Sequence, residues 1–329
     1  MLIKAALAVG IIVILLRHSG VKSENFTGLR PVWLVAAFAA VLAQNLLTGI
    51  RWWYLLRAAG VKVSLFDAVS LTMQGLFFTL FIPGGSVSGD VVKGALIAGK
   101  TGEGHKFDAV FSILIDRLCG LCGLFILSLL AALLALLQPV KWPEFFADML
   151  YVVVAAAPVF LLCFVAAFRC DIILKVAFFK KLYDLANRLT RGGISRIEQA
   201  LAAYRPAWKT VVAWTLLSGF AAFPLIVLAV WLIAVAALGI SGSCDSGVVI
   251  GSLLSGSIGE LAGILPLTPG GIGVRDAVFV EIFKACGLPG AASAVIPIVF
   301  TTLFVLASST GALFALYMLW AGKKHPGKK

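Results

Sequence analysis

Long apolar runs constrain this fold more than any other feature. A helix needs about 20 apolar residues to cross the hydrocarbon core of a bilayer. Five runs meet or approach that length: 32–50, 107–137, 146–168, 210–238 and 291–320. Residues 2–16 are a shorter sixth, interpreted as a retained first helix because no signal-peptide cleavage site follows. The runs predict an all-α polytopic membrane protein with about six full spans in a single membrane domain, 1–329.

The low content of charged residues supports this interpretation. Only 13% of the chain is charged, whereas soluble proteins carry about 25%. This excludes a soluble enzyme. The net charge of +12 would suggest nucleic acid in a soluble chain. In a membrane protein, an excess of basic residues marks the cytoplasmic loops instead. No nucleic-acid partner is therefore expected.

Two further apolar stretches are interrupted in the same way. Residues 64–82 run into Pro83-Gly84-Gly85, and residues 247–267 run into Pro269-Gly270-Gly271. A short amphipathic arm follows each break. The pattern of each stretch therefore predicts an apolar arm, a break at Pro-Gly-Gly and a second, amphipathic arm.

Loop charges predict the orientation. Residues 169–209 hold nine basic residues against three acidic ones, and the tail carries four lysines. Both regions are expected in the cytoplasm. Arg51, Arg57 and Lys62 suggest another cytoplasmic loop, whereas 241–247 has no basic residue and is placed outside. Residues 17–31 are assigned outside despite three basic residues. The prediction is a bacterial cytoplasmic membrane protein with both termini inside.

This orientation makes both interrupted segments enter and leave on the same side. Segment 64–106 would enter from the cytoplasm and segment 247–290 from outside, as two re-entrant hairpins. Residues 32–137 and 210–320 would then form an inverted-topology repeat. Residues 146–209 would supply a central span and a cytoplasmic amphipathic connector on the membrane surface. Two ordinary helix pairs with interfacial loops, and a plain charged connector, are the alternatives.

The breaks have the chemistry of an anion site. Proline lacks an N–H and glycine permits positive φ, so a ligand can approach the backbone closely. The following arm presents a helix N-terminus, to which phosphate binds readily. Candidate substrate-binding residues are Pro83, Gly84, Gly85, Asp90, Lys93, Pro269, Gly270, Gly271, Arg275 and Asp276.

Charges also occur inside the apolar runs, where each costs about 2.5–3.5 kcal/mol on insertion scales. Asp116, Arg117 and Glu260 are candidates for a polar pathway or a gate. The alternative is structural pairing between helices. Because Asp116 and Arg117 are adjacent on a helix, they point in different directions, and each is expected to pair elsewhere. Cys119 and Cys122 are interpreted as packing residues, and no metal or cofactor is expected.

Three ordered motifs resemble a known family. FTLFIPGGSVSGDVVKGALI, DRLCGL and LPLTPGGIGVRDAVF are similar to the membrane region of lysylphosphatidylglycerol synthase and its stand-alone, flippase-like relatives. The resemblance covers nearly the whole chain. It implies a helix bundle with two re-entrant segments that moves a phosphate-bearing lipid between leaflets. It also adds Gly89, Gly120 and Gly273 to the expected site. Lys93 stands where the family often has Arg, and Asp276 where it often has Glu.

A lipid transporter of the inner membrane is the leading hypothesis, with a phospholipid or a polyprenyl-phosphate lipid as its partner. The chain ends nine residues after Trp320, so the aminoacyl-transferase domain of the synthases is not expected, and neither is their reaction. A membrane-embedded transferase or phosphatase acting on lipid phosphates is an alternative, although no D-x-D or paired-histidine cluster is present in the sequence. A small-anion permease and a regulatory or scaffolding role also stay open.

Overall fold

The structure is a computed structural model that describes residues 24–82, 86–138, 142–168, 187–190, 193–264, 268–288 and 290–324. All regular structure in these ranges is helical. Six segments are long and apolar enough to cross a membrane: Pro31–Ala58, Lys106–Leu136, Glu144–Phe168, Trp208–Ser243, Ser246–Ile264 and Gly290–Met318. The described part of the chain is thus an all-α, multi-pass membrane protein, as predicted.

Five of these segments coincide with apolar runs that were expected to cross. The sixth, Ser246–Ile264, is the first arm of the interrupted segment 247–290, and the expected helix 2–16 lies outside the described residues. Helix α3 (Pro31–Ala58) is longer than its apolar run. Arg51 and Arg57 were expected in a loop, but both belong to α3.

The first interrupted segment folds into a pair of short antiparallel helices, α4 (Leu65–Phe81) and α5 (Ser86–Lys100). Gly75 of α4 lies against Gly89 of α5. At the open end of the pair, Asp67 and Lys100 form an ion pair. At about 1.5 Å per residue, both helices are shorter than the roughly 30 Å hydrocarbon core.

The second interrupted segment is also a helical hairpin. Its first arm is α13 (Ser246–Leu254), the π-helical turn η3 (Ser255–Gly259) and α14 (Glu260–Ile264); a 3-10 turn, η4 (Pro269–Gly271), leads to the second arm, α15 (Val274–Ala285). The arms are antiparallel, because Gly251 faces Phe283 while Gly263 faces Arg275. At 12 residues, α15 is too short to cross a membrane alone.

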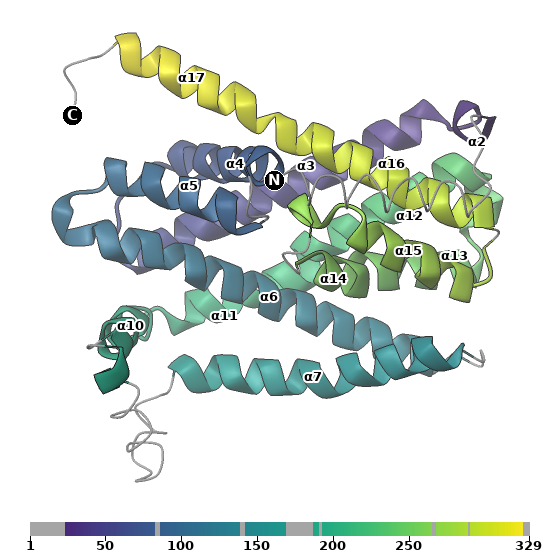
Figure 1. Cartoon of the computed structure of the whole chain (residues 1–329), viewed down its shortest axis with the longest axis horizontal. Coiled ribbons are helices and arrows are strands. Elements are labelled where there is room, and N and C mark those ends of the chain that lie inside the picture. Colours follow the sequence, from purple (N-terminus) through teal and green to yellow (C-terminus); the bar gives the residue numbers. More distant parts are fainter. Residues whose placement is uncertain are drawn as a thin grey trace.

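The remaining long helices surround the two hairpins. They include α6 (Lys106–Leu136), α7 (Glu144–Phe168), α16 (Gly290–Ser309) and α17 (Gly311–Lys324). One further segment, Trp208–Ser243, consists of α11 (Trp208–Leu217), the π-helical turn η2 (Ser218–Ala222) and α12 (Phe223–Ser243). In Figure 1, α17 and α7 lie on opposite edges of the bundle with α6 between them. The α4–α5 hairpin occupies one end of the bundle and the α13–α15 hairpin the other.

Three apolar clusters hold the bundle together. One joins α3, α12, α15 and α16, for example through Val41, Ile233 and Phe300. A second packs α3, α4, α5 and α6 around the fully buried Trp52. The third joins α7 to α6 and to the second hairpin. Each hairpin therefore has its own apolar contacts with the long helices.

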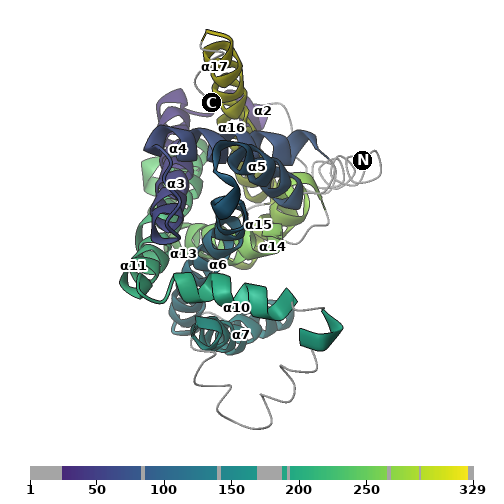
Figure 2. The ribbon, with the colours of Figure 1, turned by 90° about the vertical axis from the view of Figure 1, so that its left-hand side faces the viewer.

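Helix α10 (Gly193–Ala203) is strongly amphipathic and differs from the others in direction. Figure 2, which views the long helices nearly end-on, shows α10 crossing the bundle end beside α7. Its Ala200 is buried in the second apolar cluster. The first part of the expected connector, 169–186, lies outside the described residues.

Candidate functional site

Arg51 is the centre of a buried ionic contact between three helical elements. Its side chain lies on α3 and is 5% exposed. Nε donates a hydrogen bond to Asp116 Oδ1 on α6 at 2.7 Å, and Nη1 donates to Ser218 Oγ at 2.8 Å. Ser218 begins the π-helical turn η2, a type of turn that often occurs at functional sites. One guanidinium therefore ties α3 to α6 and to η2.

Lys93 on α5 points toward the same carboxylate without forming a hydrogen bond to any described residue. Its Nζ lies 3.9 Å from Asp116 Oδ2 and 3.7 Å from the centroid of the Trp52 ring. The ring is held in place because Trp52 Nε1 donates to Ser112 Oγ at 2.9 Å. Lys93 is 5% exposed. Among the described residues, an aromatic ring and a carboxylate compensate the ammonium, and its three donors make no hydrogen bond to them.

Asp90 lies one turn before Lys93 and pairs with the residue after Asp116. Arg117 Nε and Nη2 donate to Asp90 at 2.9 and 2.8 Å, which makes a bidentate pair. Asp116 and Arg117 thus pair with different partners, as expected from their adjacent positions. Unlike Asp116, Arg117 is accessible, with 45% of its side chain exposed.

These five residues form the first charged cluster: Arg51, Asp90, Lys93, Asp116 and Arg117. It contains three cations and two carboxylates. With all groups ionised, its net charge is +1. An excess positive charge at this depth in a helix bundle favours binding of an anion.

In the second hairpin, Asp276 has both carboxylate oxygens bonded. Gly273 N donates to Oδ2 at 2.9 Å, which caps the start of α15, and Thr301 Oγ1 of α16 donates to Oδ1 at 2.6 Å. Thr301 also accepts a hydrogen bond from Arg275 Nη2 at 2.8 Å. Because arginine can only donate, the threonine hydroxyl must direct its proton to Asp276.

Arg275 itself is enclosed. It is 2% exposed, and the rings of Phe300 and Phe304 lie 4.7 and 4.9 Å from its guanidinium carbon. Its Nη1 lies 3.4 Å from Glu260 Oε1. Aromatic rings and an acidic partner therefore surround the guanidinium of Arg275, which was predicted to bind substrate. Arg275, Asp276 and Glu260 form the second charged cluster, with a net charge of −1 when all are ionised.

The two hairpins carry their acidic residues at matching positions. Asp90 and Asp276 are each the seventh residue after the proline of their break. Each bonds to the next long helix of its own half, Asp90 to Arg117 on α6 and Asp276 to Thr301 on α16.

The described glycines of the expected site meet packing or backbone requirements. Gly89 is buried between α4 and α5, where an added Cβ would overlap the carbonyl oxygen of Gly75. Gly270, Gly271 and Gly273 have φ values of 60°, 74° and 91°, a region that favours glycine. They allow η4 to turn sharply into α15.

The last turn of α4 contacts η4, the turn of the second hairpin. A Cβ placed on Gly270 would lie 3.1 Å from Leu80 Cδ2 near the tip of the first hairpin and 3.6 Å from the Phe304 ring. Of the first break, Pro83, Gly84 and Gly85 lie outside the described residues. Nothing is concluded about their contacts, nor about the Pro269 side chain.

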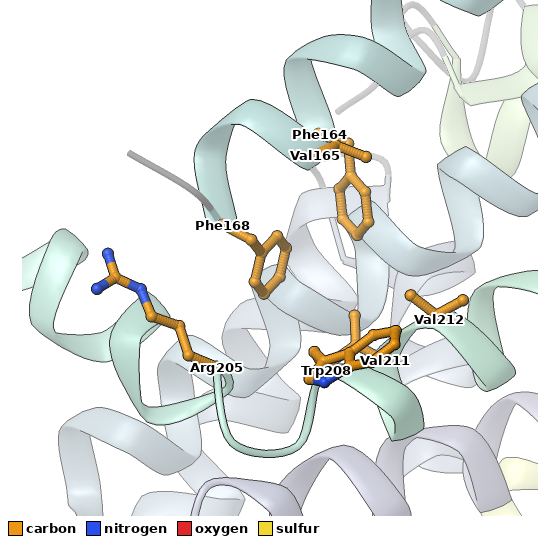
Figure 3. A pocket seen from close by; sticks show the side chains of 7 residues that line it. All are labelled: Phe164, Val165, Phe168, Arg205, Trp208, Val211 and Val212. Atoms are coloured by element: carbon orange, nitrogen blue, oxygen red, sulfur yellow. The ribbon is translucent and has the colours of Figure 1, made fainter. Parts of the chain in front are cut away.

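An apolar cavity of about 510 Å³ lies away from both charged clusters. It is formed between the end of α7 and the start of α11 by seven residues: Phe164, Val165, Phe168, Arg205, Trp208, Val211 and Val212. Figure 3 shows that its aromatic side chains face one another while the Arg205 guanidinium points away. None of the predicted site residues lines it.

Sequence reasoning missed three members of the polar network: Arg51, Ser218 and Thr301. For Arg51 a signal exists, because Arg51, Trp52, Leu55 and Leu56 repeat on one helical face and are buried together. Ser218 and Thr301 are single hydroxyl residues within apolar runs, and no comparable periodic pattern identifies them in the sequence. Cys119 and Cys122 are buried and unpaired, as expected of packing residues. In the described part of the chain, no three His, Cys, Asp or Glu side chains form a group suited to a metal.

Comparison with known proteins supports the motif resemblance. The family described as lysylphosphatidylglycerol synthase TM region matches residues 1–320. Neither a curated protein nor a solved structure gives a significant match. The family match extends over nearly the entire chain and includes both hairpins and α6. The chain therefore belongs to the lysylphosphatidylglycerol synthase transmembrane-region family.

Proposed function

We propose that this protein moves a phosphate-bearing lipid between the leaflets of the bacterial cytoplasmic membrane, and that it does so as a transporter and not as an enzyme. The first charged cluster would hold the phosphate while the acyl or polyprenyl chains stay in the surrounding lipid. Family membership supports a lipid-related role in the membrane. The residues around Lys93 supply the argument for a phosphate.

The single observation that carries the proposal is the state of Lys93. Its buried ammonium has an aromatic ring on one side and a carboxylate beyond hydrogen-bonding distance on the other. A phosphate oxygen would satisfy donors that no described residue satisfies, and its charge would neutralise the excess of the cluster. The nearby Arg117, held by Asp90 and partly exposed, offers a second donor set as the phosphate approaches.

The arrangement of the helices is consistent with two inverted repeats. One would comprise α3, α4–α5 and α6, and the other α11–α12, α13–α15 and α16–α17. The first arm of each hairpin packs against the last part of the opposite half, α4 against α17 and α13 with η3 against α6. This exchange of contacts is what an inverted-topology repeat would produce. We propose that the hairpins are re-entrant from opposite sides, with both termini in the cytoplasm.

Movement would follow from the contact between the hairpin tips. Leu80 and Gly270 meet where the two hairpins converge, so this contact would separate the two sides of the membrane. In transporters built from inverted repeats, rocking of one repeat against the other exposes a central site alternately to each side. Opening at one tip or the other would give the phosphate access from one leaflet at a time.

The test is lipid translocation in reconstituted vesicles. The probes are fluorescently labelled phosphatidylglycerol and a labelled polyprenyl phosphate, with movement measured by a membrane-impermeant quencher. We expect wild-type protein to move at least one probe and Lys93→Gln to lose at least tenfold in rate. Lys100→Gln is the matched control, since Lys100 lies on the same helix but pairs with Asp67 at the open end.

Equal rates in wild type and Lys93→Gln would overturn the site. Movement of neither probe, together with uptake of free phosphate or another small anion, would favour a permease instead. Chemical conversion of a probe by the purified protein would favour a lipid-phosphate transferase or phosphatase. Mass spectrometry of lipids that copurify with wild type, but not with Lys93→Gln, would identify the natural substrate.

A further inference from the structure

The second charged cluster has one carboxylate more than its cation requires. Arg275 is the cation, and Asp276 and Glu260 are the acids. The elements that pack most closely on α14 are η3, α15 and η4. Among their charged residues, Arg275 approaches Glu260 at 3.4 Å, and Asp276 lies 3.8 Å from Arg275. Unlike the first cluster, this one therefore needs an additional positive charge.

Asp276 is not the carboxylate that would receive this charge. Each of its oxygens already accepts a hydrogen bond, from Gly273 N at 2.9 Å and from the Thr301 hydroxyl at 2.6 Å. Thr301 also links Asp276 to Arg275, so the charge of Arg275 is matched through this bridge.

Glu260 has the opposite environment. Among the described residues, its carboxylate accepts one hydrogen bond, from Arg275 Nη1 to Oε1 at 3.4 Å. A carboxylate with so few donors is poorly compensated at this depth. It is also the accessible member of the cluster, because 19% of its side chain is exposed, compared with 2% for Arg275 and 1% for Asp276.

We propose that Glu260 binds and releases a proton, and that this proton is coupled to the lipid movement proposed above. The coupling rests on the proposed function, whereas the proton site does not. Protonation would neutralise the second cluster as phosphate binding neutralises the first. Both hairpins could then move through an apolar surrounding without carrying an uncompensated charge.

The geometry of Arg275 provides a link between this proton and movement of the hairpin. Its Nε is buried, has no hydrogen-bond partner among the described residues and lies 3.8 Å from Asp276 Oδ1. When Glu260 becomes neutral, its attraction for Nη1 weakens. The guanidinium can then turn toward Asp276 and bring Nε within hydrogen-bonding distance. Loss of the Glu260 contact would release α15 from its ionic contact with α14, the other arm of the second hairpin.

Infrared difference spectroscopy tests the proton site directly, using the full chain in lipid nanodiscs and a change of pH as the only perturbation. We expect a carbonyl band from a protonated carboxylic acid that appears as the pH falls. Labelling all glutamates with ¹³C should shift this band in unaltered protein, which avoids any doubt about folding of a variant. The band should be lost in Glu260→Gln and kept in Glu281→Gln, where the acid forms an exposed pair with Lys284.

A band that persists in Glu260→Gln, or fails to shift with labelled glutamate, would overturn the proton site. Coupling is tested in vesicles with the same fluorescent lipids. A pH gradient should accelerate translocation by wild type and Glu281→Gln but not by Glu260→Gln. Equal acceleration in all three would overturn the coupling. If the band behaves as expected but no lipid moves, the proposed transport fails while the proton site stands.

Discussion

Arg51 and Asp116, which are 65 positions apart in the sequence, form a buried hydrogen-bonded ion pair with 2.7 Å between Nε and Oδ1. Asp116 also balances Lys93, whose Nζ approaches its other oxygen. One carboxylate therefore serves two cations. Removing Asp116 and removing Arg51 should therefore lower the stability of the protein by different amounts.

We expect Asp116→Asn to lower stability more than Arg51→Met. The first change leaves two buried cations without a carboxylate, and breaking such a pair typically costs about 3–5 kcal/mol. In Arg51→Met, Lys93 still compensates Asp116. Thermal unfolding in detergent, followed by intrinsic fluorescence, measures both. The double variant Arg51→Met/Asp116→Leu should be more stable than Asp116→Asn. A larger loss in Arg51→Met than in Asp116→Asn would contradict this account.

The close contact between the arms of the first hairpin gives a second prediction. Gly89→Ala should destabilise the protein by about 1–3 kcal/mol, as overpacking does, because the added methyl group would overlap Gly75 O and Thr79 Oγ1. Gly99→Ala on the same helix meets no atom within 4 Å. It should be neutral or gain up to about 1 kcal/mol of helix propensity. Thermal unfolding of both variants tests the pair, and equal midpoints would contradict the packing role of Gly89.

The hairpins could be predicted from the sequence because their signals are local. Pro-Gly-Gly interrupts an apolar run, and α5 and α15 begin within three residues of their breaks. The main spans were predictable for the same reason. The functional assignment of Gly89 came from resemblance alone, and the structure adds that this residue lets two backbones approach.

The polar network was less predictable because it depends on contacts between distant residues. The apolar run ending at residue 50 suggested that Arg51 begins a loop. The helix continues because Asp116 and Ser218 compensate the charge. Thr301 was also missed, since a single threonine in an apolar run has no periodic pattern to identify its partner. Its role depends on the arrangement of α15 against α16.

Thr301 provides a matched pair of variants on α16. Thr301→Val removes the hydroxyl that joins Arg275 to Asp276, leaving two buried groups unsatisfied at a cost of about 1–3 kcal/mol. Thr302 is exposed and bonds to Ile298 O within its own helix. Thr302→Val should therefore change stability by no more than about 0.5 kcal/mol. Thermal unfolding of the two variants provides the measurement. An unfolding midpoint of Thr301→Val equal to that of wild type would contradict the bridge.

Arg117 should affect transport more than stability. Its pair with Asp90 is bidentate but 45% exposed on the arginine side, so its loss should cost no more than about 1 kcal/mol. As a second phosphate donor, Arg117 should nevertheless matter for translocation of the labelled lipids. We expect the rate to fall in the order wild type, Arg117→Lys, Arg117→Gln, because lysine keeps the charge without the bidentate geometry.

Arg57→Gln is the control for Arg117, since Arg57 lies in the last turn of α3 and stacks over the Trp53 ring at 4.7 Å, away from the first charged cluster. It should translocate the probes at the wild-type rate. Thermal unfolding of every variant separates loss of transport from loss of fold. A stable Arg117→Gln protein with wild-type translocation would show that Arg117 only positions Asp90. In that case Lys93, which no described residue satisfies with a hydrogen bond, would be left as the sole phosphate donor of the cluster.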